Sequence, residues 1–471
     1  MNSDSIPIDL ITEICSRLPA KSIARFRCVS KLWSSILRRP YFTELFLTRS
    51  SAKPRILFAI EGDGWWSLFS LPQTLMSPYD ESSSSLVVTA KYHMDFHQDP
   101  NMWIHPSSDR HFSCGYASGL IYFYSMCIKL KDDYVEVPSI CNPNTGQYAI
   151  LPSLERGVEG FEKPFSFFGF DPIDKQYKVL KPHQGCGGYH RIVTLGNGKE
   201  VWKPYDQGCC CDHKIVTLGT GKMRWRTIKC PLPHDPVSEG ICINGVLYYL
   251  GDYQNYARSD VVDYESLDYV LVCFDVRSEK FKFIYGLQSL CKLINYKGKL
   301  CVIYWEDNHV GWKDHVDAIE LYMWILEDAE KQEWSKYAYT LWDDKFFVDD
   351  NKYAPVVVVG VTSMGEIILS MGYYTSDQPF YVFYFNPKKN TIQSVEIRGL
   401  EECDHNNHFR SKVYTFVDHV EDLNVNDSKL LNLSIYAPYV KTKEEEKDEE
   451  EEEHDKDEGK GEPRRRRWRA W

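Results

Sequence analysis

Apolar side chains recur at helical spacing from about Ser3 to Leu47. In the first predicted helix they lie one, three and four residues apart, at Leu10, Ile11, Ile14 and Leu18. Pro19 ends this helix, because the residue before a proline is pushed out of helical backbone angles. A second helix follows, and a third begins after Ser30, a good N-cap, and stops at Arg39-Pro40. The pattern predicts a three-helix unit.

This helical unit is very small for the apolar surface that it carries. Below roughly 40 residues a domain usually needs a disulfide, a metal or a partner to be stable. We see no disulfide framework or metal-binding pattern in it, so we expect it to bury part of its surface against something else. The residues predicted for this contact are Pro7, Leu10, Ile14, Leu18, Pro19, Ile23, Val29 and Trp33. Other apolar residues, most obviously Phe26, Ile36 and Leu37, are expected to pack the helices against one another.

From about Lys53 to Leu433 the pattern changes to short apolar strands separated by turns. Three turns, Asn244-Gly245, Lys297-Gly298 and Met364-Gly365, each lead into an apolar strand and lie 53 and 67 residues apart. Each strand is followed by a segment typical of a β-hairpin, and Ala117–Tyr122 begins a fainter copy of the pattern. About four strands per unit at a period near 50 residues is typical of kelch-like β-propeller blades. A stacked β-sandwich is the alternative.

A local duplication interrupts this body. His190–Lys199 is nearly repeated as His213–Lys222, 23 residues later, and we interpret the first copy as an inserted loop. Around it lie the residues that come nearest to a metal-binding pattern: His183, Cys186, His190, Cys209, Cys210, Cys211 and His213. Zinc sites favour paired ligands two to four residues apart. Three contiguous cysteines do not fit that spacing, so we predict free thiols, no metal site and no cofactor.

A charged tail follows the body. Its acidic run, Glu444–Asp457, cannot bury apolar surface and is predicted to be disordered. Four consecutive arginines come next, Arg464, Arg465, Arg466 and Arg467, which suit a nuclear import signal or an anion-binding patch. A tail that is merely solvated explains them equally well. We expect the protein in the nucleus, the cytoplasm or both, and divide the chain into 1–48, 49–435 and the tail 441–471.

Composition narrows the function classes. Of the 471 residues 43% are apolar and 26% charged, as in ordinary soluble proteins, and the net charge of −12 disfavours nucleic acid as a general partner. The most apolar run, Ala354–Val361, is far shorter than the roughly 20 residues that cross a bilayer. The N-terminal residues lack a secretory pattern, so we expect no membrane partner. The 15 cysteines, many within apolar strands, fit a reducing compartment.

The helical segment resembles the F-box over Ile6–Ile14, Arg17–Ile23 and Arg25–Trp33. Departures are few: Ile6 stands where the family usually has Leu, and Cys15 replaces a branched aliphatic residue. The body is similar, more loosely, to the F-box-associated domain of plant F-box families, at Lys53–Ala59, Cys141–Gly146, Phe168–Pro172, Tyr177–Leu180 and Val216–Gly219. The resulting fold class is α+β multidomain: a three-helix F-box, a mainly β, propeller-like domain, and a disordered tail.

This resemblance implies a substrate-receptor subunit of a Skp–cullin–F-box (SCF) ubiquitin ligase. The F-box would dock on a Skp-type adaptor, and through it on a cullin, and the body would hold a protein substrate that the sequence does not identify. The predicted apolar contact face would then be the adaptor-docking face. Because ubiquitin arrives on another subunit, such a receptor needs no catalytic residue. No Gly-x-Ser-x-Gly motif occurs and the histidines are dispersed, so we predict that the chain is not an enzyme.

Two other functions stay open on the residues alone. The first is a β-propeller that binds a glycan or small ligand without a ligase role, with Trp65, Trp66, Trp305 and Trp312 as candidate pocket residues. Packing between blades is the commoner role for such tryptophans. The second is a nucleic-acid contact through the basic tail, which salt would weaken.

Overall fold

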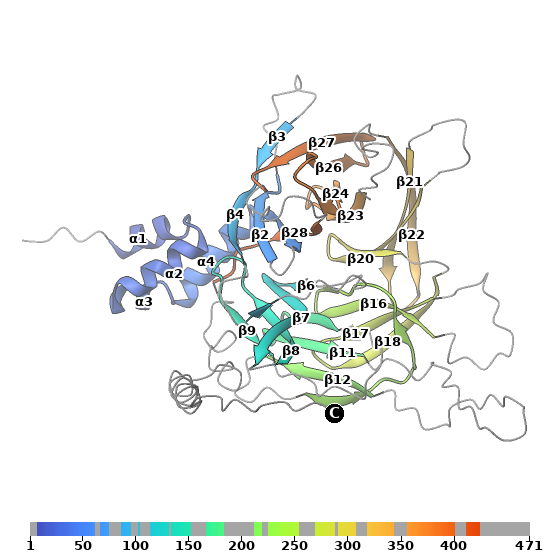
Figure 1. Ribbon diagram of the computed structural model, residues 1–471, viewed down its shortest axis with the longest axis horizontal. Helices are drawn as coiled ribbons and strands as arrows, with labels where there is room; N and C mark the ends of the chain where they lie inside the picture. The colour runs from blue at the N-terminus through green and yellow to red at the C-terminus, as the bar shows by residue number, and fades with distance from the viewer. Residues whose placement is uncertain are drawn as a thin grey trace, which may run out of the picture.

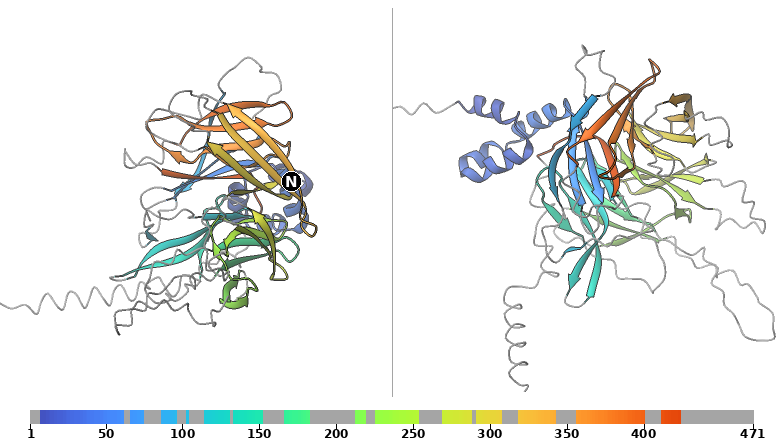
Figure 2. Two further views of the ribbon diagram at one scale, coloured as in Figure 1. Left: turned by 90° about the vertical axis from the view of Figure 1, so that its right-hand side faces the viewer. Right: turned by 45° about the horizontal axis from the view of Figure 1, so that its top comes forward.

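The computed structural model describes residues 7–61, 66–74, 86–95, 102–103, 114–130, 133–151, 166–182, 212–218, 225–253, 269–287, 291–307, 318–342, 356–400 and 411–423. These residues form a ring of β-sheets with a group of helices projecting from one side (Figure 1). The right-hand view of Figure 2 shows the helices standing clear of the sheets. Within the described ranges, every helix is too short or too polar to cross a bilayer.

The N-terminal part of the described chain contains four helices, α1 (Ile8–Cys15), α2 (Ala20–Val29), α3 (Lys31–Ile36) and α4 (Pro40–Ser51). Pro7 and Pro19 immediately precede α1 and α2, where a missing backbone N–H costs no helical hydrogen bond. Ser30 caps α3 as predicted, because its hydroxyl accepts a hydrogen bond from the Trp33 amide at 3.2 Å.

The sequence predicted three helices in this unit, and the number was wrong. Pro40 was expected to end the third helix, but α3 already ends at Ile36 and Pro40 is the first residue of α4. Proline is favoured at that position because its fixed φ suits a helix and its missing N–H would have had no helical partner. The same proline that prevents one continuous helix therefore begins the next.

Six sheets make up the remainder, as the blades of a β-propeller. Blade 1 contains, in spatial order, β25 (Tyr373–Tyr374), β28 (Ser411–His419), β1 (Arg55–Glu61), β2 (Trp66–Pro72) and β4 (Lys91–Asp95). Blade 2 contains β5 (Met102–Trp103), β7 (Leu120–Leu130), β8 (Asp133–Cys141) and β9 (Tyr148–Ile150), with β6 (Cys114–Ala117) also paired to β7. Blade 3 contains β10 (Phe167–Asp171), β11 (Gln176–Lys181), β12 (Asp212–Thr217) and β13 (Arg226–Lys229).

Blades 4 to 6 follow the same plan. Blade 4 contains β14 (Asp235–Pro236), β16 (Val246–Asp252), β17 (Tyr269–Asp275) and β18 (Lys280–Leu287), with β15 (Ile241–Ile243) also paired to β16. Blade 5 contains β19 (Lys292–Tyr296), β20 (Lys299–Asp307), β21 (Ala318–Asp328) and β22 (Glu333–Trp342). Blade 6 contains β23 (Val356–Val361), β24 (Ile367–Met371), β26 (Phe380–Asn386), β27 (Thr391–Arg398) and β3 (Leu86–Thr89).

The predicted turns are the inner hairpins of blades 4, 5 and 6, which confirms the propeller over the sandwich. Asn244 and Gly245 both have positive φ, of 49° and 83°, and connect β15 to β16. Glycine adopts that conformation without strain, and asparagine tolerates it better than most residues. The hairpin expected after each turn is also present, as β17–β18, β21–β22 and β26–β27.

In the described residues, the hydrophobic core of the propeller is divided into six clusters, one between each blade and the next, including blades 6 and 1. Alternate residues of a strand point to opposite faces of its sheet, so one strand can serve two clusters. In β1, Phe58 packs into the cluster shared with blade 6, whereas its neighbour Leu57 packs into the cluster shared with blade 2. This explains why the five central residues of β1 are all buried.

The ring is closed by strands from both ends of the chain. β28 pairs antiparallel with β1, so that Leu57 lies opposite Phe416 and Ala59 opposite Tyr414. A second closure joins β3 to β27 in parallel, with Val87 opposite Glu396. The first and last described strands, β1 and β28, are therefore neighbours in blade 1, beside the point where α4 leads into β1.

Part of the predicted organisation lies outside the described residues. This applies to the first copy of the duplication and to the charged tail 441–471, including Arg464–Arg467. The second copy is described over 212–218, where it forms β12, and the outer strand predicted after it is β13.

Trp66, one of the candidate pocket tryptophans, is 1% exposed and packs against Phe123 and Tyr414, as blade packing requires.

Candidate docking face on the helical unit

Six large apolar side chains on the helical unit are exposed, each by 46% or more: Ile8, Leu10, Ile14, Val29, Leu32 and Tyr41. They come from α1, from the end of α2, from α3 and from the start of α4. We call these six residues the apolar face. Apolar side chains lose free energy when they leave water, so a concentrated group of them on a small unit favours binding to another surface.

Helix α1 shows why the face exists. Leu10 and Ile14 are four residues apart and both point to solvent, with exposures of 53% and 56%. Cys15 is 3% exposed on the inner side, and Ile11 packs partly against the same core. The helix is therefore apolar on two sides, and the helical unit covers only one of them.

A cluster of charges holds the other side of α1 in place. The Glu13 carboxylate accepts hydrogen bonds from the guanidinium groups of Arg49, on α4, and Arg17. Arg49 also donates to the Ser16 hydroxyl and to the Glu13 carbonyl oxygen. Hydrogen bonds from Arg49 and then Arg17 lower the pKa of Glu13 below its ordinary value. Because α1 is bound to α4 on this side, Leu10 and Ile14 are held facing outward.

The segment after β28 completes the helical unit. Leu423, 2% exposed, belongs to a core otherwise made by Cys15, Ala20, Ile23, Leu37, Phe42 and Phe46. The Ala20 amide donates to the Glu421 carboxylate at 2.6 Å, and the Glu421 amide donates to the Ser50 hydroxyl at 2.9 Å. The helical unit is thus attached to blade 1 both through α4 and through the segment after β28.

The structure separates the predicted contact residues into three groups. Five are exposed: Pro7, Leu10, Ile14, Pro19 and Val29. Leu18 and Trp33 are half-buried against the helical core, and Trp33 stacks on Phe26 with a centroid distance of 5.3 Å. Ile23 is 0% exposed, so it packs the helices together and does not contribute to an outward face. Ile36 and Leu37, expected inside, are buried there.

Three exposed residues of the apolar face were missed. Ile8, Leu32 and Tyr41 have exposures of 46%, 65% and 70%. Leu32 and Trp33 are adjacent on α3 and point in directions about 100° apart, and of the two only Trp33 packs partly against the helical core. Helical spacing alone did not decide which of the two side chains faces outward. Tyr41 had no such signal, because α4 itself was not predicted.

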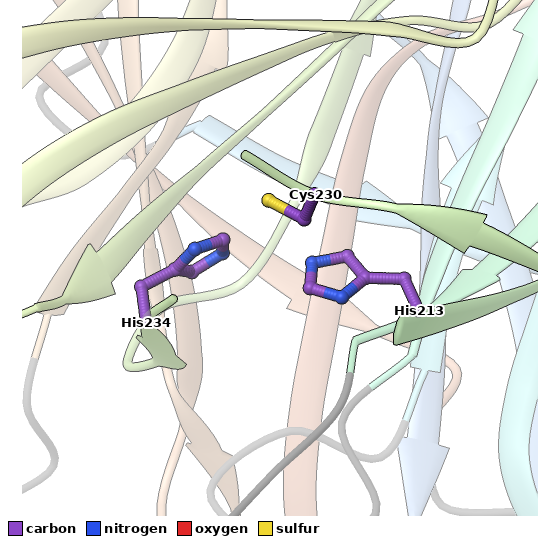
Figure 3. Close-up of side chains that lie close together, drawn as sticks. All are labelled: His213, Cys230 and His234. Carbon is purple, nitrogen blue, oxygen red and sulfur yellow. The ribbon is translucent and has the colours of Figure 1, made fainter. Parts of the chain in front are cut away.

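The structure also groups side chains that were not predicted to meet. His213, Cys230 and His234 lie with their ligand atoms within 4.8 Å of one another, and all three are buried (Figure 3). Of the Cys and His residues that the sequence suggested together, only His213 is within the described residues. The nine cysteines whose side chains are described form no disulfide with one another.

Comparison with known proteins connects both parts of the molecule to one kind of protein. A family model described as an F-box domain matches residues 3–45, and one described as an F-box associated beta propeller domain matches residues 55–420. F-box protein At1g47340 of Arabidopsis thaliana is 52% identical over 449 residues, which cover 93% of this chain and 87% of that protein. F-box protein At2g16450 of the same plant is 48% identical over 470 residues, covering 94% and 98%.

Proposed function

This chain belongs to the F-box proteins that carry an F-box-associated β-propeller domain, and on that premise we propose that it is the substrate-recognition subunit of an SCF ubiquitin ligase. Its helical unit binds a Skp-type adaptor, which connects it to a cullin, and its propeller holds a protein substrate. The observation that carries the proposal is the apolar face, which lies on the matched F-box residues.

In this proposal the exposed apolar side chains make the contact with the adaptor. Leu10 and Ile14 on α1 and Val29 and Leu32 around α3 supply apolar side chains for a groove of the adaptor. The helical core is already filled by Leu423, so binding buries the outer face without rearranging the inner one. A surface that is organised before binding loses little conformational entropy in the complex, which favours tight association.

The propeller has a positioning role in this proposal. It needs no bond-making residue, because it raises the local concentration of a substrate's lysines near ubiquitin carried by another subunit. Both attachments of the helical unit to blade 1 maintain the orientation between adaptor and substrate. The loops of the blades present a broad surface on a rigid scaffold.

The direct test is affinity purification of the full chain from plant cells. We expect the wild type to co-purify with a Skp-type adaptor and a cullin, and the double variant Leu10→Ala/Pro19→Ala to lose both. Ile173→Ala/Met364→Ala is a matched control, since these propeller side chains are 66% and 74% exposed. Undiminished recovery of adaptor with Leu10→Ala/Pro19→Ala would contradict the proposal, provided that its far-ultraviolet circular dichroism matches the wild type.

We further propose that Arg464–Arg467 direct part of the protein to the nucleus. The support is the run of four consecutive arginines beside an acidic, low-complexity sequence. Replacing all four with alanine should shift a fluorescent fusion of the full chain toward the cytoplasm. Equal nuclear fractions for wild type and variant would contradict this assignment and leave adaptor binding unaffected.

A further inference from the structure

The closest grouping of metal-ligating side chains in the described residues lies between blades 3 and 4. His213 is on β12, Cys230 directly follows β13, and His234 directly precedes β14. Figure 3 shows the two rings and the thiol directed toward one another. We propose that His213, Cys230 and His234 form a structural zinc site that joins blade 3 to blade 4.

The geometry is close to that of a bound ion. In a tetrahedral zinc site the bonds are about 2.0–2.1 Å to nitrogen and 2.3 Å to sulfur, which puts ligand atoms roughly 3.3–3.7 Å apart. The ligand atoms of the three residues lie within 4.8 Å of one another. Small side-chain rotations are enough to close that difference. Cys230 and His234 are four residues apart, a spacing usual for zinc ligands, and β-pairing places His213 beside them, opposite Ile228.

The surroundings of His234 prepare it for coordination. Its Nδ1 donates to the Leu232 carbonyl oxygen at 2.8 Å, which fixes the tautomer and leaves the Nε2 lone pair available. Nε2 now accepts from the Tyr249 hydroxyl at 3.0 Å, and zinc would take the place of that hydrogen bond. Gly251 makes room for the ring, since a Cβ there would lie 2.6 Å from His234 Cδ2.

The donor set selects the metal. Two imidazoles and one thiol, exposed by 1%, 2% and 4%, suit a borderline-soft ion such as Zn²⁺, whereas Mg²⁺ and Ca²⁺ prefer oxygen ligands. On binding, the Cys230 thiol would release one proton to solvent, and its thiolate sulfur and the two imidazole nitrogens would supply three ligands to the metal. The ion would connect the β12–β13 edge of blade 3 to the β14 edge of blade 4.

The test uses the purified full chain, freed of metal with a chelator and titrated with Co²⁺ and then Zn²⁺. We expect one ion per chain, and a thiolate-to-cobalt charge-transfer band that zinc abolishes. The band should be lost in Cys230→Ser and kept in Cys273→Ser, the matched control, because Cys273 is also buried, on β17, but lies outside the cluster. Zinc should raise the thermal unfolding midpoint of the wild type and of Cys273→Ser only.

A second measurement needs no variant. In mild denaturant, zinc should slow alkylation of Cys230 at least about tenfold, as measured by mass spectrometry, without changing the rate at Cys273. Absence of bound metal in the wild type would overturn the proposal. So would zinc that stays with folded Cys230→Ser and is lost from a Cys209→Ser/Cys210→Ser/Cys211→Ser variant, since the ligands would then lie in that run.

Discussion

The helical unit and the propeller cover their apolar surface in different ways. In the described residues, six large apolar side chains are exposed between Ile8 and Tyr41. The described residues of the propeller expose seven, distributed over several blades: Val87, Tyr92, Ile173, Tyr285, Tyr337, Trp342 and Met364. The density of exposed apolar side chains is therefore several times higher on the helices.

The difference follows from the architecture of each part. A blade has two apolar faces, and a neighbouring blade of the same chain covers each of them, because the ring closes on itself. The helical unit has only one layer. Leu423, which follows the last described strand, completes the inner core of the helical unit. No described residue covers the outer face of that unit. A part of a protein that is incomplete in this way is suited to binding another chain.

The largest expected effect comes from opening the ring. Ending the chain at Leu400 removes β28, which pairs with β1 and contributes Val413 and Tyr414 to two inter-blade clusters. Native domains are stable by only about 5–15 kcal/mol, so we expect no cooperative thermal transition by circular dichroism. Ending the chain at Val440, which removes only the tail 441–471, is the control and should melt like the wild type. A cooperative transition in the shorter protein would show that blade 1 does not depend on its closing strand.

A smaller and local effect is expected at the junction. Leu423→Ala removes a side chain that is 2% exposed in the helical core, a change that typically costs about 2–5 kcal/mol. Hydrogen exchange followed by mass spectrometry should show faster exchange in α2 and α4 and unchanged exchange in blades 3 to 5. The control is Met364→Ala, at a side chain that is 74% exposed. Exchange that rises equally in helices and blades would mean that the two parts unfold as one unit.

The smallest expected effect is a dependence on pH in blade 1. His419 is fully buried, accepts a hydrogen bond from the Tyr116 hydroxyl at 2.9 Å, and donates one to Asn144 Oδ1 at 3.2 Å. Burial, with smaller contributions from His93 and Arg55, lowers its pKa from 6.5 to about 3. The unfolded chain therefore binds the proton more strongly. The contribution of neutral His419 to the free energy of unfolding is complete above pH 6.5. It is lost as the pH falls toward 3.

Urea unfolding between pH 7.5 and 4.5 measures this loss. We expect the wild type to lose about 1–3 kcal/mol more than His419→Gln over that range, because one unit of pKa shift corresponds to about 1.4 kcal/mol. Comparing how the unfolding free energies of the two proteins change with pH cancels the contribution of other titrating groups. It also cancels any constant destabilisation caused by the substitution. Parallel pH profiles for the two proteins would contradict the assignment to His419.

The sequence predicted those parts of the fold that have local signals. The dipeptide Asn244-Gly245 alone indicates a hairpin turn, and the apolar runs on either side indicate the two strands that it connects. The pairing of β28 with β1 has no local signal, because it joins positions more than 350 residues apart and periodicity does not identify partners. The role of Leu423 was unpredictable for the same reason.

The candidate sites were predictable to different extents. Helical spacing placed Leu10 and Ile14 correctly on an outer face, but spacing alone did not reveal that Ile23 points into a core completed by another part of the chain. The His213–Cys230–His234 cluster was not predicted, because only the pairing of β12 with β13 brings His213 close to the other two residues. Residues that meet through strand register cannot be found from their separation in sequence.

The central claim is that the apolar face binds a Skp-type adaptor, and isothermal titration of purified adaptor into the full chain tests it most directly. Leu10→Asp should weaken binding about 100-fold, since it places a charge in an interface that excludes water. Ile173→Asp, an equally drastic change at a propeller side chain that is 66% exposed, should leave the affinity unchanged. Equal affinities for the wild type and Leu10→Asp, or no binding by the wild type, would contradict the account.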